Sequence, residues 1–399
     1  MSFGIDIACA VQIDGQQEVV DAHVSQEYGD SSSVIEVTFD WNHFTAGFPN
    51  IVAPVGGRLP SIISPVNFIA TNKTGSVNNG VSNPTGITAN AAALNISYSG
   101  HPCRSQPVDL HFYLANFPEF TRISPLQVNL NGLLIDFQYA SDGRINRKAI
   151  ISGIALDRLT ETIELLNDCC WLCSLAAGCL VVMPRIDVFV NGGISQTYLK
   201  NVDLSMPDTG KSLVHDRMNA ITLKSFLENS VGHFRIVCSD YNLSALIHLG
   251  LLAKHNHYLQ VKALLMSDFL EVLRYQFAAN VGVRTGILSQ RNTEFYWIRN
   301  SIRATFEAIL QRFCGDTGLS GWDSDFKDLR NEIMHTGDLT GSNKFGRYGN
   351  LHHFCDRVLL ALLNWDRYGG HYIPFDNQVS TSFSHNSSDV SVNRIPYTR

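Results

Sequence analysis

The hydrophobic pattern of this 399-residue chain changes its period near residue 211. Before that point, segments such as residues 34–41 (VIEVTFDW) alternate apolar and polar side chains, as half-buried β-strands do. After it, residues 245–254 and 258–277 carry apolar side chains at three- and four-residue spacing, which is typical of amphipathic helices. Two periods in succession predict an α+β protein whose strands and helices belong to separate domains.

The first predicted domain spans residues 1–207 and is β-rich, with a sandwich- or jelly-roll-like arrangement. It contains one inserted helix at about residues 157–177. Two hairpins are predicted from their Asn-Gly turns, in residues 126–139 and 180–199. Residues 71–100 are rich in Asn, Gly, Thr and Ser, so we expect long loops there.

The second predicted domain spans residues 211–374 and is an all-α bundle, because several amphipathic segments follow one another with short polar connections. Beyond the two segments named above, it is expected to contain helices at residues 293–313, 323–334 and 351–365. Residues 375–399 form a polar tail that we expect to be frayed.

The bulk composition narrows the class of protein. The net charge of -6 argues against a uniformly basic nucleic-acid surface, although phosphate contact needs only a few well-placed cations. Nine cysteines, mostly in apolar runs, favour reduced thiols in a cytoplasm. The first residues lack the basic and apolar regions of a signal peptide. The longest apolar run, residues 169–183, is shorter than the roughly 18 residues that a membrane span requires.

The segment RNEIMH closes an amphipathic helix, FKDLRNEIMH. Its apolar side chains fall on one face that should pack into the bundle: Phe326, Leu329 and Ile333. Asn331 and His335 lie one helical turn apart, and Arg330 is one step round from Asn331, so the three polar side chains can face one groove. Thr336-Gly337 ends the helix directly after His335.

The sequence LRNEIMHTG resembles the signature of the HEPN superfamily, whose ribonucleases carry an Arg, a polar residue and a His at this spacing. Arg330, Asn331 and His335 match these positions. The resemblance covers the chain from about residue 240 onward, and the layout of a β-rich domain before the bundle is similar to ApeA-like abortive-infection proteins. It implies a homodimer in which two motifs face each other across one cleft.

The chemistry of these residues agrees with that resemblance. RNA carries its own nucleophile, the 2′-hydroxyl, so an enzyme needs only a proton acceptor or donor and a fixed positive charge. His335 can act as acid or base, a role worth roughly 10²–10⁴-fold in rate. Arg330 can hold phosphate oxygens, and Asn331 can orient the phosphate or the imidazole. We expect 2′,3′-cyclic phosphate and 5′-hydroxyl ends, with no metal and no cofactor.

The resemblance further implies an effector of bacterial phage defence that cleaves tRNA or another essential RNA. A phage component acting on the β-rich sensor domain is the expected trigger. The alternative is a non-catalytic HEPN module for dimerisation or for RNA or nucleotide binding, regulated by a sugar, peptide or other ligand of the β-domain.

Each site residue also has a purely structural interpretation. Arg330 and His335 can cap their helix and pair with acids such as Asp325, Asp328 or Glu332. The spacing alone is weak evidence, because RYGNLH repeats it; with its Tyr-Gly-Asn turn signal, this second copy is expected in a loop. Glu271, on an earlier helix, is the candidate for a supporting role, or else a solvated partner of Arg274.

Two further groups carry open alternatives. Cations and aromatic residues in one stretch can either bind RNA or form an ordinary surface: Arg284, Arg291, Tyr296, Trp297, Arg299 and Arg303. A cluster of cysteines is expected to fill the core rather than bind zinc, because no second Cys or His pair has the required spacing: Cys169, Cys170, Cys173 and Cys179.

Overall fold

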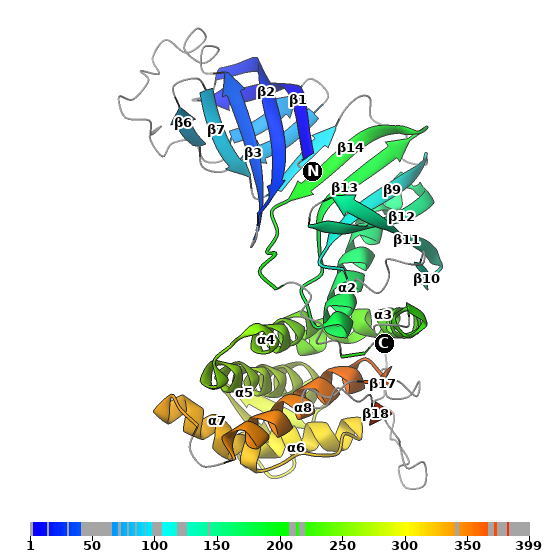
Figure 1. The fold of residues 1–399 in the computed structure, drawn as a ribbon. Coiled ribbons are helices and arrows are strands. Elements are labelled where there is room, and N and C mark those ends of the chain that lie inside the picture. Colours follow the sequence, from blue (N-terminus) through cyan, green and yellow to red (C-terminus); the bar gives the residue numbers. More distant parts are fainter. Residues whose placement is uncertain are drawn as a thin grey trace. The chain divides into compact units, whose positions relative to one another are not determined.

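The computed structural model (Figure 1) describes residues 3–13, 16–29, 32–40, 66–70, 73–77, 80–83, 86–91, 93–97, 106–117, 126–142, 144–206, 213–214, 220–339, 343–365, 371–372 and 381–382. Contacts divide the chain into two compact units. The first contains Met1–Val128, Leu133–Cys170 and Val181–Pro207, and the second contains Asn129–Gly132, Trp171–Leu180 and Asp208–Arg399. Strands occupy the N-terminal half and helices dominate the C-terminal half, so the predicted α+β class is confirmed.

The first unit contains two antiparallel sheets. Within the described residues, the first sheet has seven strands in the order β5-β4-β1-β2-β3-β7-β6. Their bounds are β1 (Phe3–Ile13), β2 (Gln16–Tyr28), β3 (Ser33–Asp40), β4 (Val66–Ala70), β5 (Lys73–Val77), β6 (Gly80–Asn83) and β7 (Gly86–Ala91).

The second sheet has, among the described residues, seven strands in the order β10-β11-β12-β9-β13-β14-β8. Their bounds are β8 (Ala93–Ser97), β9 (Pro107–Ala115), β10 (Leu126–Leu130), β11 (Leu133–Asp142), β12 (Ile145–Ala155), β13 (Val182–Val190) and β14 (Gly193–Lys200). Both predicted hairpins are confirmed: β10 and β11 join at Asn131 and Gly132, which have φ of 51° and 86°, and β13 pairs with β14.

The prediction of long loops in residues 71–100 is wrong where the structure describes them, because four of the strands (β5 to β8) lie there. Their side chains are mostly small or polar, so the alternation that marks a half-buried strand is weak. Pairing with neighbouring strands decides the conformation instead, as in the register of β7 with β3 and of β8 with β14.

The inserted helix is α2 (Leu159–Ala177), preceded by one 3₁₀ turn, η2 (Leu156–Arg158). It ends at Gly178, whose φ of 70° requires a left-handed conformation that glycine adopts without strain. The cysteines of this helix are buried and unbridged, as expected of small core residues.

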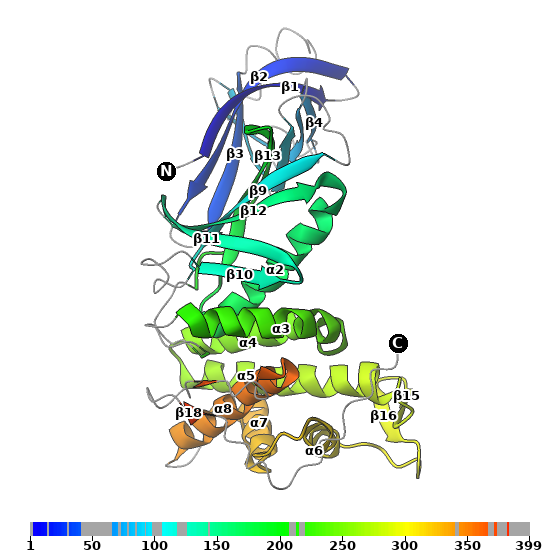
Figure 2. The same cartoon turned by 90° about the vertical axis from the view of Figure 1, so that its right-hand side faces the viewer.

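The helical unit is built around α5 (Leu259–Gln276), which packs against α4, α7 and α8. In Figures 1 and 2, α5 lies between the α3–α4 pair on one side and α6, α7 and α8 on the other. The remaining helices are α3 (Ala220–Tyr241), α4 (Leu243–His255), α6 (Phe306–Thr317), α7 (Asp325–Thr336) and α8 (Lys344–Leu362). A π-helical turn, η3 (Phe277–Gly282), extends α5, and β17 (His371–Tyr372) pairs with β18 (Thr381–Ser382).

Two helix predictions in this unit need correction. Residues 293–313 do not form one helix: they contain β16 (Glu294–Trp297), a turn, and the start of α6, while β15 (Leu288–Arg291) forms the other strand of a hairpin. Asn292, with φ of 57°, makes the hairpin turn, and the Thr305 hydroxyl caps α6 by accepting from the Ala308 N–H. The predicted frayed tail lies almost entirely outside the described residues.

The second correction concerns RYGNLH, which was expected in a loop. Arg347 and His352 lie in α8, which begins already at Lys344. Gly349 is buried in this helix, so tertiary packing outweighs the turn preference of the local sequence.

Candidate active site

The motif helix α7 buries the face that its spacing predicted. Phe326, Leu329 and Ile333 are within the core of the helical unit. Gly337 follows the helix with φ of 73°, and its N–H donates to the Ile333 carbonyl at 3.0 Å. On this helix, Asn331 and His335 lie opposite the buried face, whereas Arg330 lies beside it and contacts α5.

Arg330 is fixed by contacts from three directions. Its Nη2 donates to Oε1 of Glu271 on α5 at 2.5 Å, and its Nη1 donates to Oδ1 of Asn331 at 2.8 Å. Its guanidinium carbon lies 5.5 Å from the centre of the Phe306 ring, a cation–π contact. The buried Nε of Arg330 has no hydrogen-bond partner within the described residues. The guanidinium thus has a defined orientation while its donors are not all used.

Glu271 joins two arginines. Oε1 accepts from Arg330, and Oε2 accepts from Nε of Arg274 at 2.9 Å. Both contacts considered for Glu271 therefore occur: it pairs with Arg274 on its own helix and with Arg330 of the motif. One turn earlier on α5, the pKa of Asp268 is raised by burial and by the nearby charge of Glu271, while Arg330 opposes the shift.

His335 lies in the last turn of α7, and its side chain is exposed. Among the described residues, no hydrogen bond or ion pair joins it to Arg330, Asn331 or Glu271. The structure therefore brings three of the four predicted site residues into one connected group, and leaves His335 at the exposed end of the same helix.

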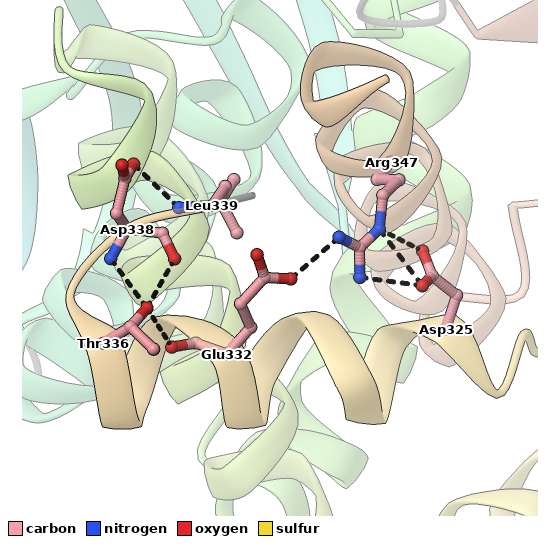
Figure 3. Close-up of polar contacts among 6 residues, drawn as sticks. All are labelled: Asp325, Glu332, Thr336, Asp338, Leu339 and Arg347. Atoms are coloured by element: carbon pink, nitrogen blue, oxygen red, sulfur yellow. Dashed lines mark hydrogen bonds and ion pairs between the residues drawn. The ribbon is translucent and has the colours of Figure 1, made fainter. Parts of the chain in front are cut away.

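The segment after His335 is held by a small hydrogen-bond network (Figure 3). The Thr336 hydroxyl lies 2.8 Å from the Glu332 carbonyl and 2.9 Å from that of Asp338. The Asp338 carboxylate accepts from the Leu339 N–H at 2.8 Å and from Gln260 on α5 at 2.9 Å. The bond from Gln260, followed by that from Leu339, lowers the pKa of Asp338. This network fixes how the chain leaves the motif helix.

The acids beside the motif pair with Arg347 rather than with Arg330. Figure 3 shows Arg347 of α8 reaching across to two carboxylates of α7. Its Nη2 lies 2.8 Å from Asp325, and its Nη1 lies 2.8 Å from Glu332. These bonds raise the pKa of Arg347 above its ordinary value. The structural interpretation, in which Arg330 pairs with Asp325 or Glu332, is therefore not what the structure shows: Arg330 pairs with Glu271 instead. The arginine of the second Arg-x4-His copy joins α8 to the motif helix.

The histidine of that second copy is a core residue. His352 is fully buried, and its Nδ1 lies 2.7 Å from the Tyr348 hydroxyl. Burial lowers its pKa to about 4, although Asp356, which forms a buried ion pair with Lys254 at 3.3 Å, acts in the opposite direction. His352 thus does not line an accessible cleft.

Sequence reasoning missed two contributors to the site. The contact of Phe306 with Arg330 had no sequence signal, because any aromatic residue near the start of a helix is equally compatible with the core. The role of Arg347 was hidden by the turn-like sequence around it. Among the described residues, no group of three or more His, Cys, Asp or Glu side chains is arranged to hold a metal ion.

No protein-family model matches this chain, and comparisons with curated proteins and with solved structures yield no significant match. In the part of the chain that the structure describes, no single helix has the length and hydropathy to cross a membrane; α3 and α4 meet that criterion only as a pair bent by 92°.

Proposed function

We propose that this chain is a HEPN-type, metal-independent endoribonuclease in which Arg330, Asn331 and His335 act on the RNA phosphodiester. The observation that carries the proposal is the ion pair between Arg330 and Glu271. It places an acid from an earlier helix against the motif arginine and orients a guanidinium beside a polar amide. Such a preorganised cation is suited to a developing phosphate charge.

The proposed reaction needs only these side chains and the RNA. His335 takes the proton of the 2′-hydroxyl, and O2′ attacks the adjacent phosphorus. The bond to the 5′-oxygen breaks, and that oxygen receives a proton, which leaves a 2′,3′-cyclic phosphate and a 5′-hydroxyl. Arg330 stabilises the charge on the non-bridging oxygens, while Asn331 orients the phosphate.

We further propose that the working unit is a homodimer. Within one chain, His335 and Arg330 make no described contact with each other, and His335 is exposed at the helix end. A second copy facing this end would add a second histidine, so one imidazole can accept a proton while the other donates. Specific activity should then fall when the protein is diluted below its dimer dissociation constant.

A second function has one observation in its favour. Glu271 already neutralises Arg330, and both side chains are only 29% exposed, as expected of an ion pair that joins α5 to α7. In this alternative the chain is a non-catalytic dimerisation module that binds RNA or a nucleotide under control of a ligand of the β-domain.

One experiment separates the two functions. The full-length protein is incubated with end-labelled RNA in EDTA, and products are examined for cyclic-phosphate ends. We expect cleavage by the wild type and by His257→Ala, which removes another exposed imidazole, but not by His335→Ala. Cleavage should spare DNA, which lacks the 2′-hydroxyl. Equal cleavage by His335→Ala contradicts the proposal.

In the proposed biological setting, the protein is a cytoplasmic effector of abortive phage defence. The β-domain, which we propose to be a sandwich- or jelly-roll-like sensor, binds a phage component, and cleavage of tRNA or another essential RNA then stops growth. The support is the succession of a β-rich unit and a helical unit that carries the motif. Phage plating on cells that express the wild type or His335→Ala tests this role; equal plating contradicts it.

A further inference from the structure

The hairpin β15–β16 continues into a second turn that carries exposed side chains. After β16 the chain reverses at Ser301, which has φ of 55° and donates its N–H to the Trp297 carbonyl at 2.8 Å. Trp297 N–H then donates to Ile302 at 2.9 Å, and Ala304 N–H donates to Phe295 at 2.8 Å. Figure 2 shows this yellow segment between β16 and α6. The turn is therefore an ordered extension of the hairpin.

This region differs in charge from the rest of the chain. Residues 283–305 contain four arginines and one acidic residue, Glu294. Arg284 forms an ion pair with Asp240 of α3 at 2.6 Å. The other three arginines and Glu294 give the segment a net charge of +2, whereas the whole chain has a net charge of -6. A local concentration of positive charge on an acidic protein favours binding of a polyanion at that place.

The arginines of the hairpin are available to phosphate to different degrees. Arg303 pairs with Glu294 at 2.9 Å, but its side chain is 68% exposed, so water weakens the pair. Arg299, exposed in the turn, has no ion pair within the described residues. Arg291 lies over the Tyr296 ring, with its guanidinium carbon 5.0 Å from the ring centre. Arg299 and Arg303 are therefore the strongest candidates for phosphate contact.

Apolar surfaces alternate with these cations. Ile298 and Ile302 are 53% and 61% exposed on the same turn. Tyr275, at the end of α5, is 42% exposed, and its ring packs edge-on against Phe295 of β16 at 5.7 Å. Unstacked bases of a single strand can stack on an exposed ring such as that of Tyr275, and the two isoleucines offer apolar contact beside the arginines.

The chain links this turn to the candidate active site by two short routes. Arg303 precedes Phe306 by three residues, and the Phe306 ring contacts the Arg330 guanidinium. Three extended residues span at most about 11 Å. On α5, Tyr275 lies one turn after Glu271, which pairs with Arg330. A strand of nucleotides bound at the turn can therefore continue toward Arg330.

We propose that Arg299 and Arg303, with Ile298, Ile302 and Tyr275, form a binding surface for single-stranded RNA that leads the substrate toward Arg330. The choice of RNA rests on the proposed ribonuclease function, while the choice of a polyanion with exposed bases rests on the charge and the exposed side chains. A protein partner on the same surface is an outcome that the test distinguishes.

The test measures binding of a fluorescent single-stranded RNA by the full-length chain carrying His335→Ala, which suppresses turnover. Arg299→Ala/Arg303→Ala removes the proposed phosphate contacts. Arg158→Ala/Arg312→Ala is the matched control, because it removes two exposed arginines that pair with Glu161 and Asp316 elsewhere. Each phosphate contact to a single strand contributes about 0.7 to the slope of log K against log salt. We expect the hairpin variant to lose about 1.4 of that slope and to bind roughly 20-fold more weakly at 0.1 M salt, while the control stays near the parent.

The outcomes are distinct from those for the catalytic proposal. Weaker RNA binding by the hairpin variant supports the inference even if the wild type does not cleave RNA. Equal affinity for the hairpin variant and the control overturns it, even if the wild type cleaves RNA through His335. Unchanged RNA affinity with a changed sedimentation coefficient also overturns it and identifies a protein interface instead.

Discussion

The Glu271 carboxylate accepts a 2.5 Å hydrogen bond from Arg330, and through it the central helix α5 orients the motif arginine on α7. Glu271→Ala should leave a partly buried guanidinium without its counter-charge. We expect a loss of roughly 1–2 kcal/mol in the free energy of unfolding, discounted because both groups are partly exposed. The measurement is urea denaturation of the full chain.

Glu271→Gln separates orientation from charge. The amide oxygen of glutamine can still accept from Arg330, so stability should recover in part. If Glu271 positions Arg330 for catalysis, kcat should fall about tenfold in the alanine variant while KM changes little. Equal kcat in wild type and Glu271→Ala, with reduced stability, would show that the ion pair serves the fold alone.

Arg347 contacts the motif helix through its acids, so we expect its replacement to lower the stability of the protein. Its bonds to Asp325 and Glu332 join α8 to the first residue of α7 and to its second half. Arg347→Ala should lower the free energy of unfolding by roughly 1–3 kcal/mol, since Asp325 loses a bidentate partner and Glu332 loses one charged hydrogen bond.

Arg312→Ala is the matched control for Arg347, because it breaks an exposed pair within one helix. That pair should contribute less than about 0.5 kcal/mol. Thermal unfolding of both variants checks the difference. If the two variants have the same melting temperature, Arg347 does not stabilise the motif helix.

The sequence identified the face of α7 that packs, because that face follows from helical spacing. It named Glu271 of α5 as one candidate partner of the motif only through the resemblance to helical bundles of this kind. It failed where tertiary packing opposes local preference. Phe295, Ile298 and Ile302 have a helix-like spacing, yet the turns at Asn292 and Ser301, both with positive φ, fold them into a hairpin. Hydrophobic periodicity does not reveal such turns, because the residues with positive φ are not glycines.

The second Arg-x4-His copy shows the same limit at the site. Gly349 and Asn350 favour a turn, but the surrounding apolar residues of α8 bury the helix and keep it continuous. Pairing of Arg347 with α7 depends on how two distant helices cross, which spacing within one segment does not specify. In the same way, the sequence could name Glu271 as a candidate partner of the motif, but it could not show which arginines Glu271 pairs with.

Burial of His352 predicts a pH dependence of stability. Its pKa is lowered from 6.5 to about 4, mainly by desolvation. Between these values the unfolded chain binds one proton more than the folded chain, so stability is fully present above pH 6.5 and falls as the pH drops toward 4. We expect a slope of up to about 1.4 kcal/mol per pH unit from this group.

Urea denaturation of the wild type, His352→Gln and His257→Gln at several pH values checks this expectation. His352→Gln removes the buried imidazole, so its stability should depend less steeply on pH in that window, whatever its absolute stability. His257→Gln, which changes an exposed residue, should keep the wild-type slope. If the free energy of unfolding of His352→Gln depends on pH as steeply as that of the wild type, other groups cause the pH dependence.

Gly282, the last residue of the π-helical turn η3, sets the position of the hairpin. A Cβ there would lie 2.7 Å from Cδ1 of Leu288, so Gly282→Ala must displace the buried Leu288 side chain of β15. Overpacking of this kind costs about 1–3 kcal/mol.

Gly250→Ala, in the middle of α4 with nothing within 4 Å of the new Cβ, should instead stabilise the protein, by up to about 1 kcal/mol because alanine favours the helix. Thermal unfolding should show a lower melting temperature for Gly282→Ala and a higher one for Gly250→Ala. Hydrogen exchange should be faster in β15 and β16 for Gly282→Ala only. An unchanged or raised melting temperature for Gly282→Ala would mean that the hairpin is not held by close packing at Gly282.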